Sequence, residues 1–265
     1  MGLALLVACT GVTLASADEA NVFGYGSDSA TEANTQANCT EAATFSLMGA
    51  RIRAGNSGTA TFQFRDAGAN GQQTFQITGT GANEDAVNTD VLAAGDLFNL
   101  AYTDTGTAST MSWLKANVSF SSGHGNFHGS GSFAGNVFDV ASSTRFIHLA
   151  GATSADGQAT EANAQWKNRG YTSCEALQVR VTANARTNNS DFRNRINAGN
   201  GSLLCQFATL VTGLVTDTSP ADALADGNLI NASITLDTGL EDLTVAIVCA
   251  PLKSSTNKSE CMDGA

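Results

Sequence analysis

The sequence predicts an all-β fold: two tandem β-sandwich or jelly-roll modules related by internal duplication. Short runs rich in β-formers alternate with turn residues, and no segment carries an apolar stripe at helical spacing. Glycine is frequent, with 27 residues, whereas Pro220 and Pro251 are the only prolines, so few strands are interrupted. Nearly the same stretches of sequence also recur at a spacing of about 130 residues.

The repeat runs through most of the chain. It begins with ATEANTQ at 30–36 and ATEANAQ at 159–165. Asn-Gly follows in both copies, at 70–71 and 200–201, and this pair favours a tight hairpin turn because both residues tolerate positive φ. Later, NTDVLAAGDLFN in the first copy matches ADALADGNLIN in the second. About 110 residues per copy, with roughly eight short strands, is the size of one β-sandwich.

The repeat also predicts the domain boundaries. The first module should span residues 21–120 and the second 137–254, each closed by an apolar strand. Between them, SSGHGNFHGSGSFAGN at 121–136 is rich in Gly and Ser and is expected to be a flexible linker. A polar tail at 255–265 follows the second module.

The apolar N-terminal segment, residues 1–20, has two interpretations. It is similar to a secretion signal because its apolar run ends in the small residues ASA, and LVAC is similar to a lipoprotein box. No Lys or Arg precedes the run, however, and about seven apolar residues are short for a signal and far too few to span a bilayer. The segment also matches TVAIVCAP at 244–251, so it can instead be the closing strand of a preceding module. The residues of this strand would be Leu3, Leu5, Leu6, Val7 and Cys9.

These strand-and-turn motifs carry a resemblance to a known class of module. Together with ASSTRFIHLAG at 141–151 and ALQVRVTANA at 176–185, they resemble β-sandwich modules of bacteriophage and bacterial structural and surface-appendage proteins. The resemblance implies a surface, tail-fibre or appendage component and no defined enzymatic activity. The first copy departs from the pattern because it lacks a clear equivalent of TRFIHLAG.

Composition narrows the classes of function. A net charge of -11 disfavours binding to nucleic acid, whose phosphates would be repelled. Three His leave little material for acid–base chemistry near neutral pH, and no G-x-S-x-G or C-x-x-C motif is present. The isolated cysteines are expected to serve mainly as small core residues, although their even number also permits disulfides. They are Cys9, Cys39, Cys174, Cys205, Cys249 and Cys261.

Histidine and tryptophan residues offer few candidate binding groups. His124 and His128 lie four apart, but the glycines around them favour a polar linker over a metal site. His148 is expected to be a half-buried strand residue. A carbohydrate-binding face would need exposed aromatic side chains, for which Trp113 and Trp166 are the candidates, although Trp113 lies in an apparent core strand.

Acidic turns supply the candidate metal ligands. Clustered carboxylates suit Ca²⁺, which takes about six to eight oxygen ligands. The alternative is that these aspartates accept hydrogen bonds from nearby backbone N–H groups and so cap turns. No D-x-D-x-D-G loop is present, so turn capping is favoured, Ca²⁺ is the weaker interpretation and no other cofactor is expected. The residues concerned are Asp85, Asp90, Asp96, Asp217, Asp222 and Asp226.

The combined pattern predicts a non-enzymatic structural protein that self-assembles through β-sandwich modules. The first candidate is a virion component: a decoration, tail or fibre protein at the virion surface. One alternative is a secreted extracellular filament or pilus-like subunit at the cell surface, joined by strand donation from the N-terminal segment. Another is a carbohydrate-binding or adhesive module. The expected partners are copies of the same chain and other virion or cell-surface proteins, with no nucleic acid and no membrane span.

Overall fold

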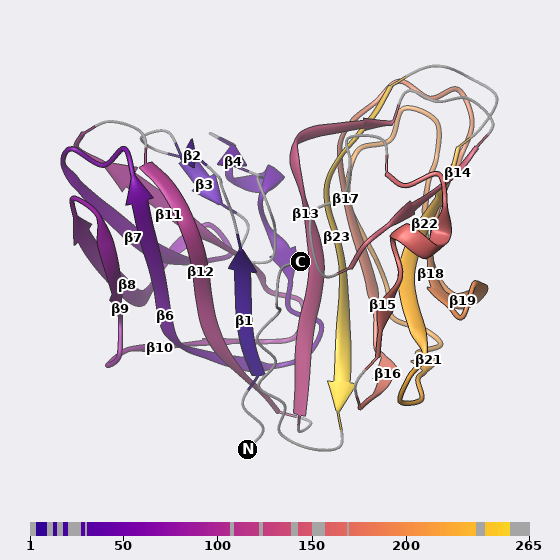
Figure 1. Ribbon diagram of the computed structural model, residues 1–265, viewed down its shortest axis with the longest axis horizontal. Coiled ribbons are helices and arrows are strands. Elements are labelled where there is room, and N and C mark those ends of the chain that lie inside the picture. Colours follow the sequence, from indigo (N-terminus) through magenta and orange to yellow (C-terminus); the bar gives the residue numbers. More distant parts are fainter. Residues whose placement is uncertain are drawn as a thin grey trace. The chain divides into compact units, whose positions relative to one another are not determined.

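The computed structural model describes eleven stretches of the chain: residues 4–9, 13–14, 18–20, 28–29, 31–106, 109–121, 124–138, 143–149, 157–168, 170–236 and 242–254. Strands dominate this part, and its two helices are single 3-10 turns. The chain divides into two compact units, the first formed mainly by Met1–Asn126 and the second by Phe127–Ser255 (Figure 1). The all-β prediction is therefore confirmed.

Unit 1 contains two sheets of six strands each. The first sheet has the order β1 (Ala4–Cys9), β12 (Ser109–Phe120), β6 (Ala43–Ala54) and β10 (Thr89–Leu92), with β2 (Thr13–Leu14) beside β12 and β9 (Gly81–Glu84) beside β6. The second has the order β4 (Asp28–Ser29), β3 (Asp18–Ala20), β11 (Leu97–Asp104), β7 (Thr59–Asp66) and β8 (Ala69–Thr78), with β5 (Ala37–Asn38) beside β11. The 3-10 turn η1 (Glu32–Asn34) precedes β5.

Aromatic side chains join the two sheets of unit 1. Phe45 on β6 lies 5.1 Å from the ring of Phe64 on β7 and 4.9 Å from that of Phe98 on β11. Phe62 and Phe64 are both fully buried, as their alternation along one strand predicts. Because residues of both sheets meet in one aromatic cluster, unit 1 is a β-sandwich.

Unit 2 contains a second pair of sheets. One has the order β20 (Gly213–Asp217), β17 (Leu177–Asn184), β23 (Leu243–Ser254), β16 (Tyr171–Cys174) and β21 (Asp222–Ala223), with β13 (His124–Phe138) beside β23. The other has the order β14 (Thr144–Ile147), β22 (Leu229–Thr235), β18 (Ser190–Ile196) and β19 (Gly199–Phe207), with β15 (Trp166–Lys167) beside β22. The 3-10 turn η2 (Glu161–Asn163) precedes β15.

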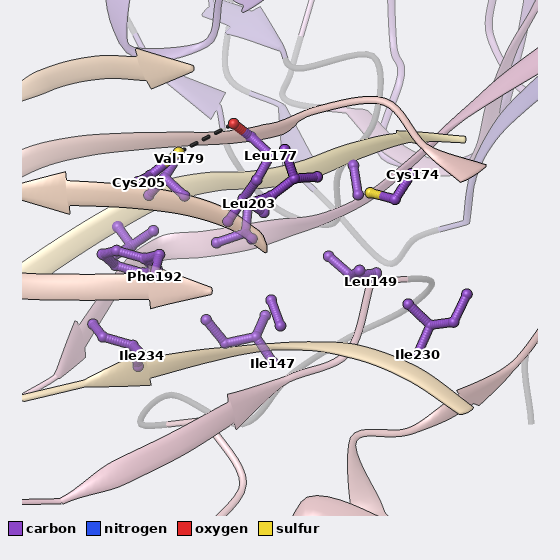
Figure 2. Close-up of a cluster of buried hydrophobic side chains, with 14 of the residues drawn as sticks. Ile147, Leu149, Cys174, Leu177, Val179, Phe192, Leu203, Cys205, Ile230 and Ile234 are labelled. Carbon is purple, nitrogen blue, oxygen red and sulfur yellow. Dashed lines mark hydrogen bonds between the residues drawn. The ribbon is translucent and has the colours of Figure 1, made fainter. Parts of the chain in front are cut away.

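The core of unit 2 lies between its two sheets. Figure 2 shows Leu177 and Val179 of β17 gathered with Phe192 of β18 and Ile234 of β22, all fully buried. Burying each such side chain contributes about 1.5–3 kcal/mol. Cys205 belongs to the same cluster and donates its S–H to the Leu177 carbonyl at 3.1 Å.

Strand pairing follows the same plan in both units. The pairs β12–β6 and β11–β7–β8 of unit 1 correspond to β23–β17 and β22–β18–β19 of unit 2. Strand β3 lies beside β11 as β14 lies beside β22, so the first copy does have a counterpart of the strand that begins TRFI in the second. This agreement is the pattern that an internal duplication predicts.

Residues 124–136 of the predicted linker at 121–136 belong to a strand instead. Residues His124–Phe138 form β13, which pairs with β23. Glycine content suggested flexibility, yet Gly125, Gly129, Gly131 and Gly135 all fall on alternate positions, which is the period of a strand. Backbone pairing can hold such a segment extended even where side chains are small, and so the prediction was wrong here.

The N-terminal segment joins unit 1. Strand β1 pairs antiparallel with β12 of the same chain along its whole length, from Ala4 opposite Val118 to Cys9 opposite Trp113. It therefore has a partner in its own chain, and it takes the place beside β12 that β13 takes beside β23. Leu3 and the polar tail at 255–265 lie outside the described residues. Among the residues that are described, no helix is long and apolar enough to cross a membrane.

Candidate functional site

The hairpin turns do not lie at Asn-Gly as predicted. Strands β7 and β8 are joined by Ala67-Gly68, and β18 and β19 by Asn197-Ala198, all four residues having positive φ. Two such residues between paired strands are the geometry of a tight hairpin. Asn-Gly comes just afterwards, inside the second strand of each hairpin.

The glycine of Asn-Gly makes room for a carboxylate. A Cβ atom at Gly71 would collide with the Asp90 carboxylate, and one at Gly201 would collide with the Asp222 carboxylate. A glycine is needed here because the neighbouring side chain approaches the backbone closely, not because of the turn.

Aspartates hold the outer edge of β8 in unit 1. Asp90, which is 6% exposed, accepts the backbone N–H groups of Gln72 and Gln73, the latter at 3.0 Å. Asp85 accepts the N–H of Thr74 at 2.9 Å. Since β8 is the last strand of its sheet and the aspartates lie in or beside strands of the other sheet, these bonds tie the sheets together. We call Asp85 with Asp90, and their counterparts in unit 2, the aspartate brackets.

The same bracket is present in unit 2. Asp222 accepts the N–H groups of Ser202 and Leu203, and Asp217 accepts the N–H of Leu204 at 2.7 Å. Strand β19, like β8, ends its sheet. An open edge exposes N–H groups to which another chain can add a strand, and each bracket occupies three consecutive N–H groups of the strand that ends one sheet.

Hydrogen bonding perturbs the acidity of Asp85. Burial alone would raise the pKa of this carboxyl. The N–H and side-chain amide of Asn88, together with the N–H groups of Thr74 and Val87, lower its pKa to about 2. The charged form is therefore the one that the bracket stabilises.

An arginine clamp supports each hairpin. Arg65 on β7 makes a two-pronged contact with Glu32 of η1, both N–O distances being 3.0 Å. The same guanidinium donates to the Asn70 side chain and the Gly68 carbonyl. A planar guanidinium suits such a contact, because its N–H groups match a carboxylate and leave others for the turn.

Unit 2 repeats the arginine clamp. Arg195 contacts Glu161 of η2 at 2.9 and 2.8 Å and donates to the Asn200 side chain and the Ala198 carbonyl. Its hydrogen bond with Glu161 raises the pKa of Arg195. The clamp explains why the Glu of the TEAN motif and the Asn of Asn-Gly recur in both copies. The sequence analysis noted the recurrence but did not predict the arginine that contacts both residues. The signal was available, since both glutamates precede an arginine by 33 or 34 residues.

The predicted calcium ligands are brought together only partly. Asp96 accepts the N–H of Ala93 at 2.7 Å. In unit 2 the equivalent hydrogen bond runs from the N–H of Ala225 to Asn228, so Asn228 takes the role of Asp96 and the exposed Asp226 does not. Within the described part of the chain, no three His, Cys, Asp or Glu side chains form a group that could hold a metal ion. The described carboxylates of this set accept backbone N–H groups, as the turn-capping interpretation predicts.

Three described cysteines are buried in the cores and form no disulfide: Cys39, Cys174 and Cys205. Burial raises the pKa of the Cys39 and Cys205 thiols to about 12, so both are protonated at neutral pH and weakly nucleophilic. These residues behave as the small core hydrophobes that the sequence predicts. Cys9 and Cys249 lie on β1 and β23, and Cys261 lies outside the described residues.

The aromatic and histidine candidates lie apart from one another. Trp166 is half-buried, packs against the core of unit 2 and lies 5.9 Å from the ring of Tyr171. His148 follows β14 and is half-buried, and burial lowers its pKa. The backbones of His124 and His128 belong to β13 and that of Trp113 to β12; their side chains are outside the described part.

Comparison with known proteins gives no family. No protein-family model and no curated protein matches the chain. Among solved structures, it is similar to a xanthan lyase from Paenibacillus, at 18% identity and a TM-score of 0.24, over 82% of this chain and 22% of that chain. It is also similar to a conserved protein of unknown function from Pseudomonas aeruginosa, at 9% identity and a TM-score of 0.21, over 83% and 77% of the two chains. Similarities this low support no argument about function.

Proposed function

We propose that this chain is a non-enzymatic structural protein that assembles with copies of itself, most directly as a virion decoration, tail or fibre component. The observation that carries the proposal is that an aspartate bracket covers part of one sheet edge in each unit. Proteins blunt an edge in this way to prevent unwanted strand addition. Selective closure directs contacts between copies to the remaining edges.

The other sheet of unit 1 supplies such edges. Its strand order begins with β1 and ends with β10. Strand β1 is six residues long and pairs with β12 over all six. If β1 of one copy instead paired with β12 of the next, the same contacts would join two chains. Exchange of an identical element between protomers is a low-cost route to assembly.

The chemistry of the described polar groups supports a structural role. Carboxylates of both brackets and both clamps are engaged with backbone N–H groups or arginine. The two thiols with raised pKa values are buried and protonated at neutral pH. These groups stabilise turns and cores, which is what a rigid building block requires.

Deletion of residues 1–10 tests the proposal. Full-length chain should form particles whose mass, measured by light scattering, increases with concentration. The deleted chain should stay monomeric while keeping the far-ultraviolet spectrum of a β protein. Unchanged assembly after the deletion would refute strand exchange through β1.

The mature N-terminus separates a virion component from an exported filament. Mass spectrometry of the native protein should find Met1 or Gly2 intact if assembly takes place in the cytoplasm. Cleavage near Ala17, or lipid on Cys9, would instead favour the secreted alternative.

A further inference from the structure

Two strands occupy equivalent places in the two units. Strand β1 pairs with β12 in unit 1, and β13 pairs with β23 in unit 2. In both cases the partner is the strand that closes the unit. The exchange between copies that is proposed for β1 is therefore open to β13 as well, unless a contact holds β13 in its own unit.

A buried arginine holds the end of β13. Arg186 lies in the turn between β17 and β18, its side chain is fully buried, and its Nη2 donates to the carbonyl oxygen of Phe138 at 2.5 Å. Phe138 is the last residue of β13, and its own side chain is fully buried in the core of unit 2. A hydrogen bond from a charged donor is roughly twice as strong as one between neutral groups. We call the contact between Arg186 and the Phe138 carbonyl the arginine latch.

The turn that carries the arginine latch is itself held in place. The side-chain oxygen of Asn184 accepts the N–H of Arg186 at 3.0 Å. The side-chain amide of Asn184 also donates to the carbonyl oxygens of Ala208 and Val211, at 3.0 and 2.9 Å, just beyond β19. The backbone of Arg186 is thus tied to the neighbouring hairpin, and its guanidinium reaches β13 from a fixed position.

The equivalent turn of unit 1 lies between β6 and β7. Asn56 accepts the N–H of Gly58, two residues later, at 2.9 Å, and donates to the carbonyl oxygen of Ile77 at 3.0 Å. Asn184 makes the same pair of contacts in unit 2, one with the residue two places on and one with the neighbouring hairpin. By this match, Gly58 stands in unit 1 where Arg186 stands in unit 2.

Position 58 has no room for a side chain. A Cβ atom added to Gly58 would lie 2.7 Å from the backbone nitrogen of Gly106 and 2.6 Å from the hydroxyl of Thr105, closer than van der Waals contact allows. Unit 1 therefore cannot carry an arginine at this place in the turn. Strand β1 is also the shorter of the two equivalent strands, with six residues against fifteen in β13.

We infer that the arginine latch keeps β13 in its own unit and so confines exchange between copies to β1. This inference rests on the proposed function, because it concerns which strand joins the copies. Release of β13 would separate the buried charge of Arg186 from the Phe138 carbonyl, and a buried charge that loses its partner is strongly destabilising. Release of β1 carries no such cost at the equivalent turn. A single exchangeable strand in each chain makes every contact between copies the same, which a regular assembly requires.

Hydrogen exchange of the full-length chain tests the latch directly. Arg186→Met removes the charged donor and keeps an unbranched side chain that can fill the site. Residues 124–138 should then exchange about tenfold to hundredfold faster than in wild type, while β17 and β18 keep their wild-type rates. Arg195→Met is the matched control, because Arg195 also belongs to unit 2 but contacts Glu161 and the hairpin instead of β13. It should leave the exchange of residues 124–138 unchanged.

The chain that lacks residues 1–10 tests the consequence for assembly. With the latch intact it should stay monomeric in sedimentation velocity, and the addition of Arg186→Met should let it assemble through β13. The addition of Arg195→Met should not. The far-ultraviolet spectrum checks the folding of every variant. Should Arg186→Met fail to fold, Arg186→Lys, which keeps the charge but lacks the planar fork of arginine, takes its place in both measurements.

Two outcomes would overturn the inference while leaving the proposed function standing. One is that residues 124–138 in Arg186→Met gain no more exchange than the rest of unit 2, and the other is that the shortened chain stays monomeric with this substitution. Full-length wild type that stays monomeric at every concentration would instead contradict the proposed function, and the hydrogen exchange of β13 would still decide whether Arg186 holds that strand.

Discussion

At the scale of single residues, most of the polar side chains that recur in both copies stabilise turns. Asp85 and Asp217 accept N–H groups from the neighbouring sheet, and Arg65 and Arg195 clamp a 3-10 turn to a hairpin. Each unit makes these contacts between equivalent residues of its own. The repeated motifs therefore consist of residues that stabilise the fold, and their pattern in the sequence indicated no catalytic site.

Protonation of Asp85 should destabilise unit 1 in acid. A carboxyl whose folded pKa lies below its unfolded value stabilises the fold above the unfolded value, here near 3.8, and that contribution is lost as pH falls toward about 2. Asp85→Asn should lower the free energy of unfolding at pH 7 by about 1–3 kcal/mol. The free energy of unfolding of this variant should also change less with pH between pH 4 and 2 than that of the wild type. Urea unfolding at several pH values measures both.

Exposed Glu84→Gln is the control for this prediction, with an expected change within about 0.5 kcal/mol. An acid dependence that is equally steep in Asp85→Asn and wild type would contradict the role given to the bracket.

Replacing the clamp arginine by lysine should weaken unit 2. Lysine cannot reach Glu161, Asn200 and Ala198 at once, so Arg195→Lys should lower the free energy of unfolding by about 1–2 kcal/mol. Thermal unfolding measures the change, and Arg193→Lys, two residues away on β18, is the matched control. Equal stability of both variants would mean that the charge matters and the fork geometry does not.

At the scale of strands, alternation and repeats predicted much of the fold. Phe62 and Phe64 face the core as their spacing indicates, and the hairpins of both units lie close to the predicted places. Two features escaped because they depend on tertiary contacts. Asn-Gly was assigned to the turn, whereas Gly71 and Gly201 admit a carboxylate from another strand. The bracket and clamp partners lie in different elements, which no local pattern reveals.

Strand β13 offers a direct test of the corrected linker. Amide hydrogen exchange should find residues 124–138 protected, because paired backbone N–H groups exchange slowly. Gly131→Pro should also lower the melting temperature, since proline removes a backbone N–H donor and fixes φ near about −65°. A flexible linker would exchange within seconds and tolerate proline.

At the scale of the whole molecule, two sandwiches are built on one plan and differ in their surfaces. Residues that stabilise the fold make the same contacts in both units, as Asp90 and Asp222 do when they accept backbone N–H groups. Where the fold makes no demand, Val91 of unit 1 faces solvent and Ala223 replaces it in unit 2. Differences of this kind are where contacts between copies can evolve without cost to folding.

Calcium should have little effect on stability. The described carboxylates of the brackets already accept backbone N–H groups, so neither 1 mM CaCl₂ nor excess EDTA should shift the melting temperature by more than about 1 °C. A rise of several degrees with Ca²⁺ that EDTA reverses would show that these aspartates bind the ion after all.

The role proposed for this chain is to build a larger assembly from its own copies. Negative-stain electron microscopy of the purified full-length protein tests it most directly. We expect regular filaments, rings or shells whose repeat has the size of one chain. A field of isolated particles, each of one chain even at high concentration, would contradict it.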